Sequence, residues 1–376
     1  MTKSISLDQD VAGKISGITA NTVNVLNNNA KIQDGVTLAS SGGIVNVAAG
    51  TYKENVMIDK SLSVKGSGAD NTIVDGQQAD SVFTVGNNSP NVDVLLTGMT
   101  IQNGSASTGG GINNYGRLTV TDSTISGNTA LNNGGGISNS GTLTVTNSLI
   151  SGNTATWNGG GVWNNNSILK VMNSNVSNNV AGWHGGGIEN WMGTVDVTGS
   201  IISRNSGLYG GGFSNDWGTV TISGSTISEN QAYTAGGILN DFGNMTVKES
   251  TIVENNAFFG GGIGNGGTAT ISGSNISGNA GEYGGGIYNE LFADKLLING
   301  TSQITNNQAA WGGGIYSDID TVTLDGTNVG IKSNKAKNPP SESSWYQGWG
   351  VYLETGIPTT ANGFDPVTQV TGNTII

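Results

Sequence analysis

The sequence of 376 residues contains 63 glycines and no cysteine, and its formal net charge at pH 7 is −12. Only 14 lysines and arginines are present, which argues against nucleic-acid binding, and the lack of cysteine excludes disulfides and thiolate chemistry. No apolar run approaches the roughly 18 residues that a membrane-spanning helix needs. We therefore expect one elongated, regular domain that neither binds nucleic acid nor spans a membrane.

Residues 1–42 are predicted to form an N-terminal segment and cap. The first thirty residues lack the continuous apolar core of a signal peptide. A short amphipathic helix is expected around Ile32 and Val36, where it would cover the open edge of the first sheet. The segments that follow alternate apolar and polar residues as strands do, at 44–47, 56–58 and 62–64.

Residues 43–330 are predicted to form the body of the fold, because a short motif returns at a fixed interval. The motif is Gly-Gly-Gly-Ile or a near copy, and its last residue recurs every 24 to 28 residues, at Ile112, Ile137, Val162, Ile188, Phe213, Ile238, Ile263, Ile287 and Ile315. Within one repeat the stretches GGGISN, GTLTVTNS and LISGN each read as a strand. Three strands in about 25 residues fit one coil of a parallel β-helix, whose coils rise by about 4.8 Å.

Two columns of asparagine support this coil. One column stands two residues after the glycine motif, at Asn114, Asn139, Asn164, Asn190, Asn215, Asn240, Asn265 and Asn289. The other stands three residues after the apolar residue of the third strand, at Asn128, Asn153, Asn179, Asn205, Asn230, Asn255, Asn279, Asn307 and Asn334. Stacked asparagines hydrogen-bond along a solenoid and satisfy the backbone of tight turns, so we predict two asparagine ladders.

A charged position gives a check on the register. Arg204, Glu229 and Glu254 share one position in three consecutive coils. If the alignment of coils is correct, Arg204 meets Glu229 across adjacent strands.

Residues 331–376 are predicted to form a C-terminal loop and a closing coil. The polar stretch 337–347 contains Pro339 and Pro340, as a loop does. The glycine motif then returns in altered form as GWGV at 348–351.

Two stretches carry a resemblance to known families. The stretch 33–75, with GGIVNVAAGTYKENVMIDKSLSVKGSG and then NTIVDG, resembles the opening of right-handed β-helix proteins of the pectin-lyase-like superfamily. The coils from 100 to 335, in which ISGNTA precedes GGGI, are similar to the repeats of polymorphic outer-membrane proteins and archaeal adhesin-like surface proteins. The resemblance implies an all-β, right-handed, single-stranded parallel β-helix in a secreted or surface-displayed protein. Lyases, hydrolases, esterases and adhesins all use this fold.

The enzyme-like feature of the sequence is a pair of carboxylates. Asp216 and Asp241 hold the same position in successive coils, in the strings SNDWG and LNDFG, so stacking would place them roughly 5 Å apart. That separation suits a retaining glycosidase, and two turn residues on an exposed corner are the structural alternative. The sequence forces no third polar group near the pair. His184, the one histidine, is interpreted as a solvated loop residue, and neither a metal site nor a cofactor is predicted.

Aromatic residues form two rows beside the glycine-rich strand. The first row lies in the connector before each glycine motif, and the second lies at the corner after it. The candidate ligand-binding members are Trp157, Trp183, Tyr209, Tyr233, Phe259, Tyr283 and Trp311 in the first row and Trp191, Trp217 and Phe242 in the second. Such rows bind sugar rings, stack on one another as ladders, or pack against another protein, and the sequence leaves the three open.

We therefore expect a non-enzymatic, adhesin-like or structural β-helix protein, extracellular or at the cell surface. It would associate with copies of itself or contact cell-envelope polysaccharide. The alternative is a polysaccharide-active enzyme, a glycoside hydrolase or lyase, that uses Asp216 and Asp241.

Overall fold

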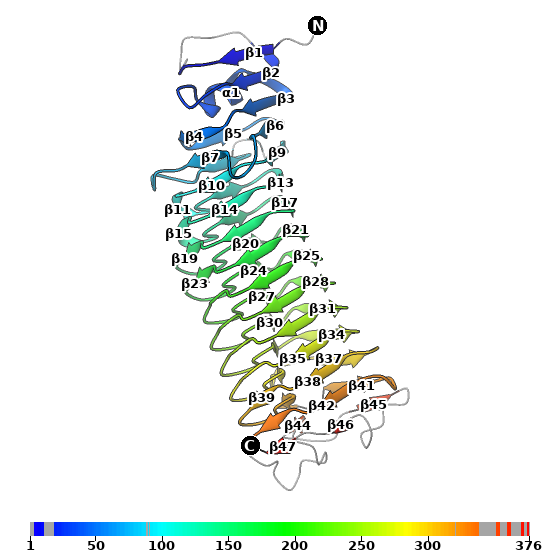
Figure 1. Ribbon diagram of the computed structural model, residues 1–376. Coiled ribbons are helices and arrows are strands. Elements are labelled where there is room, and N and C mark those ends of the chain that lie inside the picture. The colour runs from blue at the N-terminus through cyan, green and yellow to red at the C-terminus, as the bar shows by residue number, and fades with distance from the viewer. Residues whose placement is uncertain are drawn as a thin grey trace. The chain divides into compact units, whose positions relative to one another are not determined.

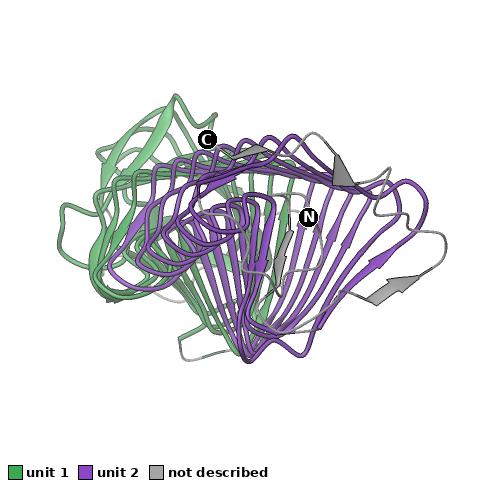
Figure 2. Cartoon of the chain, turned by 90° about the horizontal axis from the view of Figure 1, so that it is seen from below, with its two compact units in different colours: residues 1–175 green, residues 176–376 purple. Residues whose placement is uncertain are grey.

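The computed structural model describes residues 4–10, 19–87, 89, 91–319 and 321–337, and the C-terminal strands at 351–353, 359–361, 370–371 and 374–375. The chain is an all-β parallel solenoid with about 25 residues per coil, so the predicted parallel β-helix is confirmed. It divides into two compact units, residues 1–175 and 176–376, which Figure 2 shows in green and purple. The domain boundaries predicted after residues 42 and 330 stay a prediction.

The first unit contains three long parallel sheets and one short sheet, with the strands labelled in Figure 1. The first sheet runs through β1 (Ser4–Leu7), β2 (Ala20–Val25), β3 (Ala39–Val47), β6 (Leu62–Lys65), β9 (Asp93–Thr97), β13 (Arg117–Thr121), β17 (Thr142–Thr146) and β21 (Ile168–Met172). The second runs through β4 (Gly50–Lys53), β7 (Thr72–Asp75), β10 (Thr100–Gln102), β14 (Thr124–Ser126) and β18 (Leu149–Ser151). The third runs through β5 (Val56–Ile58), β8 (Phe83–Val85), β12 (Ile112–Asn114), β16 (Ile137–Asn139) and β20 (Val162–Asn165), and the short one through β11 (Ser105–Thr108), β15 (Thr129–Asn133) and β19 (Thr154–Ala155). The boundary between the units falls within β22 (Asn175–Ser177).

The second unit repeats the same three sheets. The first runs through β25 (Thr194–Thr198), β28 (Thr219–Ser223), β31 (Asn244–Lys248), β34 (Thr268–Ser272), β37 (Lys295–Asn299), β41 (Val322–Asp325) and β45 (Thr359–Ala361). The second runs through β26 (Ile201–Ser203), β29 (Thr226–Ser228), β32 (Thr251–Val253), β35 (Asn275–Ser277), β38 (Gln303–Thr305), β42 (Gly330–Lys332) and β46 (Val370–Thr371). The third runs through β24 (Ile188–Trp191), β27 (Phe213–Asp216), β30 (Ile238–Asp241), β33 (Ile263–Asn265), β36 (Ile287–Asn289), β40 (Ile315–Ser317) and β44 (Val351–Leu353). Short strands complete the unit at β23 (Val180–Ala181), β39 (Gln308–Ala309), β43 (Lys335–Ala336) and β47 (Thr374–Ile375).

The C-terminal strands continue the stack of the second unit. β44, β45, β46 and β47 pair in parallel with β40, β41, β42 and β43. These four pairings are what a closing coil requires, whereas the predicted loop lies largely outside the described residues.

The N-terminal helix is present where the sequence predicts it, as α1 (Ile32–Leu38). It packs so closely on the sheet that a Cβ at Gly35 would lie 2.7 Å from Val45 Cγ1, which explains the glycine there. β1 pairs with β2 and ends the first sheet among the described residues, and the capping role of the helix stays a prediction. Of the helices in the described part of the chain, none is long and apolar enough to cross a membrane.

The asparagine ladders are confirmed within both units. Asn215 is fully buried, donates from Nδ2 to Asn240 Oδ1 at 2.8 Å and to the Gly218 carbonyl at 3.1 Å, and accepts from Asn190 at 2.7 Å. The second column shows the same link between Asn230 and its neighbours in adjacent coils. Each side-chain amide therefore joins two coils while it satisfies the backbone of a turn.

The register check is also confirmed. Arg204 Nε lies 2.9 Å from Glu229 Oε2 and Nη2 lies 3.1 Å from Glu229 Oε1. The two residues directly follow strands β26 and β29, which pair in parallel as the alignment of coils requires.

Candidate active site

The second unit brings a strand face and a run of connectors together over several coils. On strands β24 to β36 of the third sheet, the first residue is a buried Ile or Phe and the third is the ladder Asn, so the second residue points to the other side of the sheet. In register, those second residues are Glu189, Ser214, Leu239, Gly264 and Tyr288. The connectors that precede the glycine motifs also align coil by coil, through His184, Tyr209, Thr234, Phe259 and Tyr283.

A cavity of about 470 Å³ lies between strand face and connectors. Among the described residues, nine line this acidic cavity: Trp183, His184, Tyr209, Thr234, Leu239, Asp241, Phe259, Tyr288 and Glu290. Aromatic rings form much of its wall, and two carboxyl groups and an imidazole face it. A concave, largely apolar site with a few convergent polar groups has the form of a small-molecule or glycan site.

Two glycines lie next to residues that line the acidic cavity. A Cβ at Gly266 would lie 3.1 Å from Glu290 Oε2 and 3.2 Å from Asp241 Oδ1. A Cβ at Gly264 would lie 3.2 Å from Leu239 Cδ1 and 3.7 Å from Glu290 Oε1. Neither glycine has a positive φ, so the backbone does not demand glycine at these positions. The lack of a side chain at Gly266 leaves a gap between the carboxyl groups of Glu290 and Asp241.

The gap sets a limit on how far apart these carboxyls are. Because one point lies 3.1 and 3.2 Å from the two oxygens, Glu290 Oε2 and Asp241 Oδ1 are separated by no more than the sum, about 6.3 Å. A single heavy atom in the gap contacts both groups.

Both carboxyls hold their protons more tightly than usual. Burial raises the pKa of Glu290 to about 7, and the negative charges of Asp241 and Asp318 add to the effect. Burial also raises the pKa of Asp241 to about 6, with Asp216 adding and His184 opposing. The pKa of Glu290 is raised to a higher value than that of Asp241, which is the order that a proton-donating Glu290 and an ionised Asp241 require.

Behind the acidic cavity lies a second layer of polar groups. Asp216 Oδ2 lies 2.9 Å from His184 Nδ1, and Ser214 Oγ donates to Asp216 Oδ1 at 2.9 Å. Glu189 is 1% exposed, and burial followed by the charge of Asp216 raises its pKa well above the ordinary value. Asp216 thus fixes the orientation of His184, whose ring faces the cavity.

The predicted carboxylate pair, Asp216 and Asp241, lies in register on neighbouring strands, but the two carboxyl groups have different surroundings. Asp216 is directly opposite Asp241 on paired strands β27 and β30. Asp241 lines the cavity, whereas Asp216 is buried against His184. The interpretation of His184 as a solvated loop residue is wrong, because its side chain is 23% exposed and paired.

Residues of the two aromatic rows have three kinds of surroundings. Some line the acidic cavity, some stack on one another, and some are exposed to solvent. Trp183, Tyr209 and Phe259 line the acidic cavity. Tyr283 stacks on Phe259 with ring centroids 5.3 Å apart, and Tyr233 stacks on Phe258 at 5.4 Å. Trp311 is partly exposed. One row therefore serves both as cavity wall and as ladder.

The corner row forms an exposed ledge beside the acidic carboxyls. Trp217 and Phe242 follow Asp216 and Asp241 in sequence and stack with centroids 4.6 Å apart. They are 57% and 45% exposed. Trp191 in the same row is also exposed, and so is Trp157 of the first unit. We call Trp217 and Phe242 the aromatic ledge.

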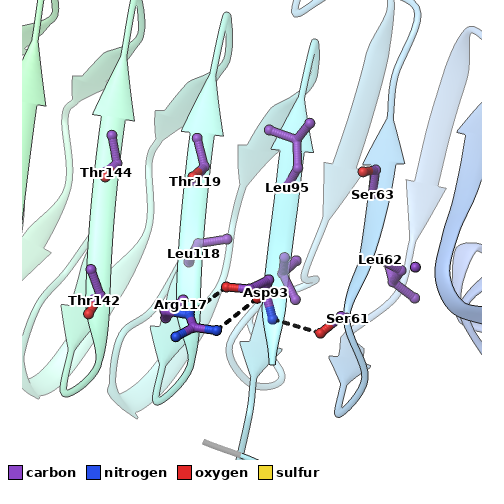
Figure 3. A pocket seen from close by; sticks show the side chains of 12 residues that line it. Ser61, Leu62, Ser63, Asp93, Leu95, Arg117, Leu118, Thr119, Thr142 and Thr144 are labelled. Atoms are coloured by element: carbon purple, nitrogen blue, oxygen red, sulfur yellow. Dashed lines mark hydrogen bonds and ion pairs between the residues drawn. The ribbon is translucent and has the colours of Figure 1, made fainter. Parts of the chain in front are cut away.

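Another hollow, of about 480 Å³, lies on the outer face of the first unit (Figure 3). Serine and threonine side chains of β6, β13 and β17 line it, and Figure 3 shows the ion pair of Asp93 with Arg117, where Nη2 lies 2.9 Å from Oδ2. Both partners of that pair are mostly exposed, and neither an aromatic residue nor a buried carboxyl is among the described residues that line the hollow. It therefore lacks the chemistry of the acidic cavity.

Sequence reasoning missed Glu189, Glu290 and Tyr288. A signal for Glu290 was present, because the residue after each ladder Asn reads Asp216, Asp241, Gly266 and Glu290 in four consecutive coils. Glu189 stands on the outer side of a strand, where a charged residue is expected to meet water, and nothing in the pattern indicates that connectors cover it.

Comparison with known proteins supplies one match. No family model and no curated protein matches the chain, so the resemblance of its coils to adhesin-like repeats stays a prediction. Among solved structures, an alginate lyase from Paenibacillus sp. str. FPU-7 aligns with 93% of this chain and 99% of its own, at 10% sequence identity and a TM-score of 0.30.

The expectation of a non-enzymatic, adhesin-like protein is corrected. It rested on a solvated His184 and on the lack of a third polar group near Asp216 and Asp241. The structure pairs His184 with Asp216 and sets Glu290 across a one-atom gap from Asp241. The enzymatic alternative therefore replaces the first interpretation.

Proposed function

We propose that this protein hydrolyses a glycosidic bond of an uncharged polysaccharide in the acidic cavity, with Glu290 as the general acid and Asp241 as the nucleophile. The observation that carries the proposal is the gap at Gly266, which holds the two carboxyl oxygens no more than about 6.3 Å apart around space for one heavy atom. Carboxyl groups roughly 5–5.5 Å apart belong to retaining glycosidases, and inverting enzymes need about 6.5–9.5 Å. The limit favours direct attack by a carboxylate.

The proposed steps balance without a cofactor. Asp241 attacks the anomeric carbon, the bond from that carbon to the glycosidic oxygen breaks, and Glu290 gives its proton to the departing oxygen. Glu290, now a carboxylate, then takes a proton from water, whose oxygen displaces Asp241 from the anomeric carbon. The raised pKa of Glu290, about 7, supports its role as the proton donor.

Two features support a sugar polymer as the substrate. The cavity walls include the rings of Trp183, Tyr209 and Phe259, which offer stacking faces for a pyranose. The aromatic ledge is exposed and directly follows Asp216 and Asp241 in sequence, so it offers further stacking faces for the sugar units of a polymer. A polymeric substrate also accords with the extracellular or surface location expected from the sequence, which fractionation of cells would test.

Hydrolysis is favoured over elimination by the charge of the cavity. Among the described residues that line it, none is lysine or arginine, and Asp241 and Glu290 face the bound ligand. A uronate carboxylate would meet negative charge with His184 as its one basic contact. Lyases that act on uronic acids need that carboxylate neutralised, so an uncharged sugar fits better.

Product analysis tests the proposal. Neutral polysaccharides and uronic-acid polymers are incubated with the protein, and both reducing ends and unsaturated products are measured. We expect reducing ends from a neutral polymer, with the anomeric configuration retained in the first product seen by NMR. Asp241→Asn and Glu290→Gln should lose this activity, and Asp196→Asn, which changes a half-buried carboxylate of β25 that does not line the cavity, should keep it. Unsaturated products, or an inverted anomer, would contradict the assignment.

A further inference from the structure

A second cluster of side chains lies next to the acidic cavity and has no role in the proposed hydrolysis beyond holding His184. His184, Glu189 and Asp216 each offer one ligand atom, and the three atoms lie within 4.8 Å of one another. We call them the buried triad. They come from the connector before β24, from β24 itself and from the end of β27. Three segments of two adjacent coils therefore converge on one point.

Glu189 is the unusual member of the buried triad. Its side chain is 99% buried, and among the described residues no hydrogen bond of ordinary geometry reaches either carboxyl oxygen, although the polar groups of Asp216 and Ser214 lie close to it. Buried carboxyl groups are ordinarily hydrogen-bonded or paired with a positive charge, because leaving one unpartnered destabilises the fold. The same strand position holds Ser214, Leu239 and Gly264 in the following coils, so the solenoid does not require an acid there.

Among the described residues, the groups that act on the Glu189 carboxyl are Asp216, Ser214 and Asp241, and none of them is basic. Asp216 is 3% exposed and accepts from Ser214 Oγ. Two carboxyl groups this close in a buried site repel each other when both are ionised. A divalent cation that takes the place of the Glu189 proton would allow both carboxyl groups to be ionised beside His184.

We propose that the buried triad binds a divalent transition-metal ion, such as Zn²⁺ or Mn²⁺, through His184, Glu189 and Asp216. One imidazole nitrogen with two carboxylate oxygens is a ligand set that Zn²⁺ and Mn²⁺ accept, whereas Ca²⁺ and Mg²⁺ take oxygen ligands almost alone. Three protein ligands leave a position for water, and the Ser214 hydroxyl stands beside Asp216. The cation reaches the triad through the acidic cavity, which His184 lines.

This site is independent of the hydrolysis proposed above. Asp241 and Glu290 supply that chemistry, and the ion would fix the inner wall of the cavity by holding His184 and Asp216 in place. The two proposals can therefore fail separately.

Metal titration of the full chain tests the site. Protein treated with a chelator and then freed of it is titrated with Zn²⁺, Mn²⁺ and Ca²⁺ by calorimetry, and its melting temperature is recorded with and without each ion. We expect one Zn²⁺ or Mn²⁺ per chain and a rise in melting temperature. Glu189→Gln keeps the size of the side chain and should weaken binding at least 10-fold, and His184→Ala, at a partly exposed position, should do the same. Asp196→Asn should bind like the unsubstituted protein.

The outcomes separate the site from adventitious binding. Without metal, Glu189→Gln should melt no lower than the unsubstituted protein, since it removes an unpartnered acid, and added Zn²⁺ should not raise its melting temperature. Equal binding by Glu189→Gln and the unsubstituted protein would overturn the proposal. So would binding of Ca²⁺ alone, or no binding of either transition metal.

Discussion

The gap at Gly266 allows the geometry of catalysis to be separated from the stability of the fold. Gly266→Ala would place a methyl group 3.1 Å from Glu290 Oε2 and 3.2 Å from Asp241 Oδ1. Both neighbours are ends of flexible side chains, and position 266 has no positive φ, so the backbone accepts alanine. We expect the free energy of unfolding to change by less than about 1 kcal/mol.

The catalytic effect of the same methyl group should be large. It occupies the space where a reacting atom of the substrate must contact both carboxyl groups. Displacement of reacting atoms by about 1 Å costs roughly 100-fold in rate, which corresponds to about 2.7 kcal/mol of activation free energy. We therefore expect kcat/KM to fall about 100-fold or more.

Reducing-end kinetics and urea denaturation on the same preparations measure the two effects. Thr270→Ala, in β34 of the same coil and away from the cavity, is the matched control and should leave both quantities nearly unchanged. If Gly266→Ala retained full activity, the gap would not be where the reaction occurs.

Three further predictions follow from the ladder, the buried acid and the ledge. Asn215→Ala removes two donated hydrogen bonds and leaves the Asn240 side-chain oxygen without its partner. The free energy of unfolding in urea should therefore fall by about 1–3 kcal/mol. An unchanged free energy of unfolding would count against an internal ladder. The pKa of Glu290 is raised from 4.5 in the unfolded chain to about 7 in the fold, so the folded state favours the protonated acid. The stability that the protonated acid contributes is fully present below pH 4.5. It is lost as the pH rises through 7, and the free energy of unfolding falls by up to roughly 3 kcal/mol. The melting temperature should fall over this window and should fall less in Glu290→Gln, and identical pH profiles would refute the burial argument. Trp217→Ala should weaken binding of an oligosaccharide by about 2- to 10-fold, measured by calorimetry, with the folded state intact; unaltered affinity would remove the aromatic ledge from the substrate path.

The solenoid and its register could be read from the sequence because both are local properties. A strand period of two and a coil period of about 25 residues place Asn215 in a ladder and Asp216 opposite Asp241, and the structure agrees on both. These features depend on neighbouring coils being alike, so a periodic pattern is enough to find them.

The rest of the site depends on which side chains the connectors carry, which the repeat does not fix. The backbone turns at Gly185, whose φ is 62°, as it does at the matching glycine of most coils, and in this coil the connector carries His184, which reaches Asp216. The connector also buries Glu189, which the strand pattern alone would place in water. Glu290 lies two coils beyond Asp241, and only the absence of a side chain at Gly266 brings the two into reach of one atom. The site therefore consists of residues that differ in type from those at the same positions in other coils.

The division of roles between Glu290 and Asp241 is tested most directly by comparing two substrates. One is the neutral polysaccharide, whose departing oxygen needs a proton, and the other is an aryl glycoside whose phenolate leaves without one. We predict that Glu290→Gln loses at least about 100-fold in kcat/KM on the polysaccharide and little in the bond-breaking step on the aryl glycoside, whereas Asp241→Asn loses both activities. Equal loss on the two substrates in Glu290→Gln, or retained hydrolysis in Asp241→Asn, would contradict the account.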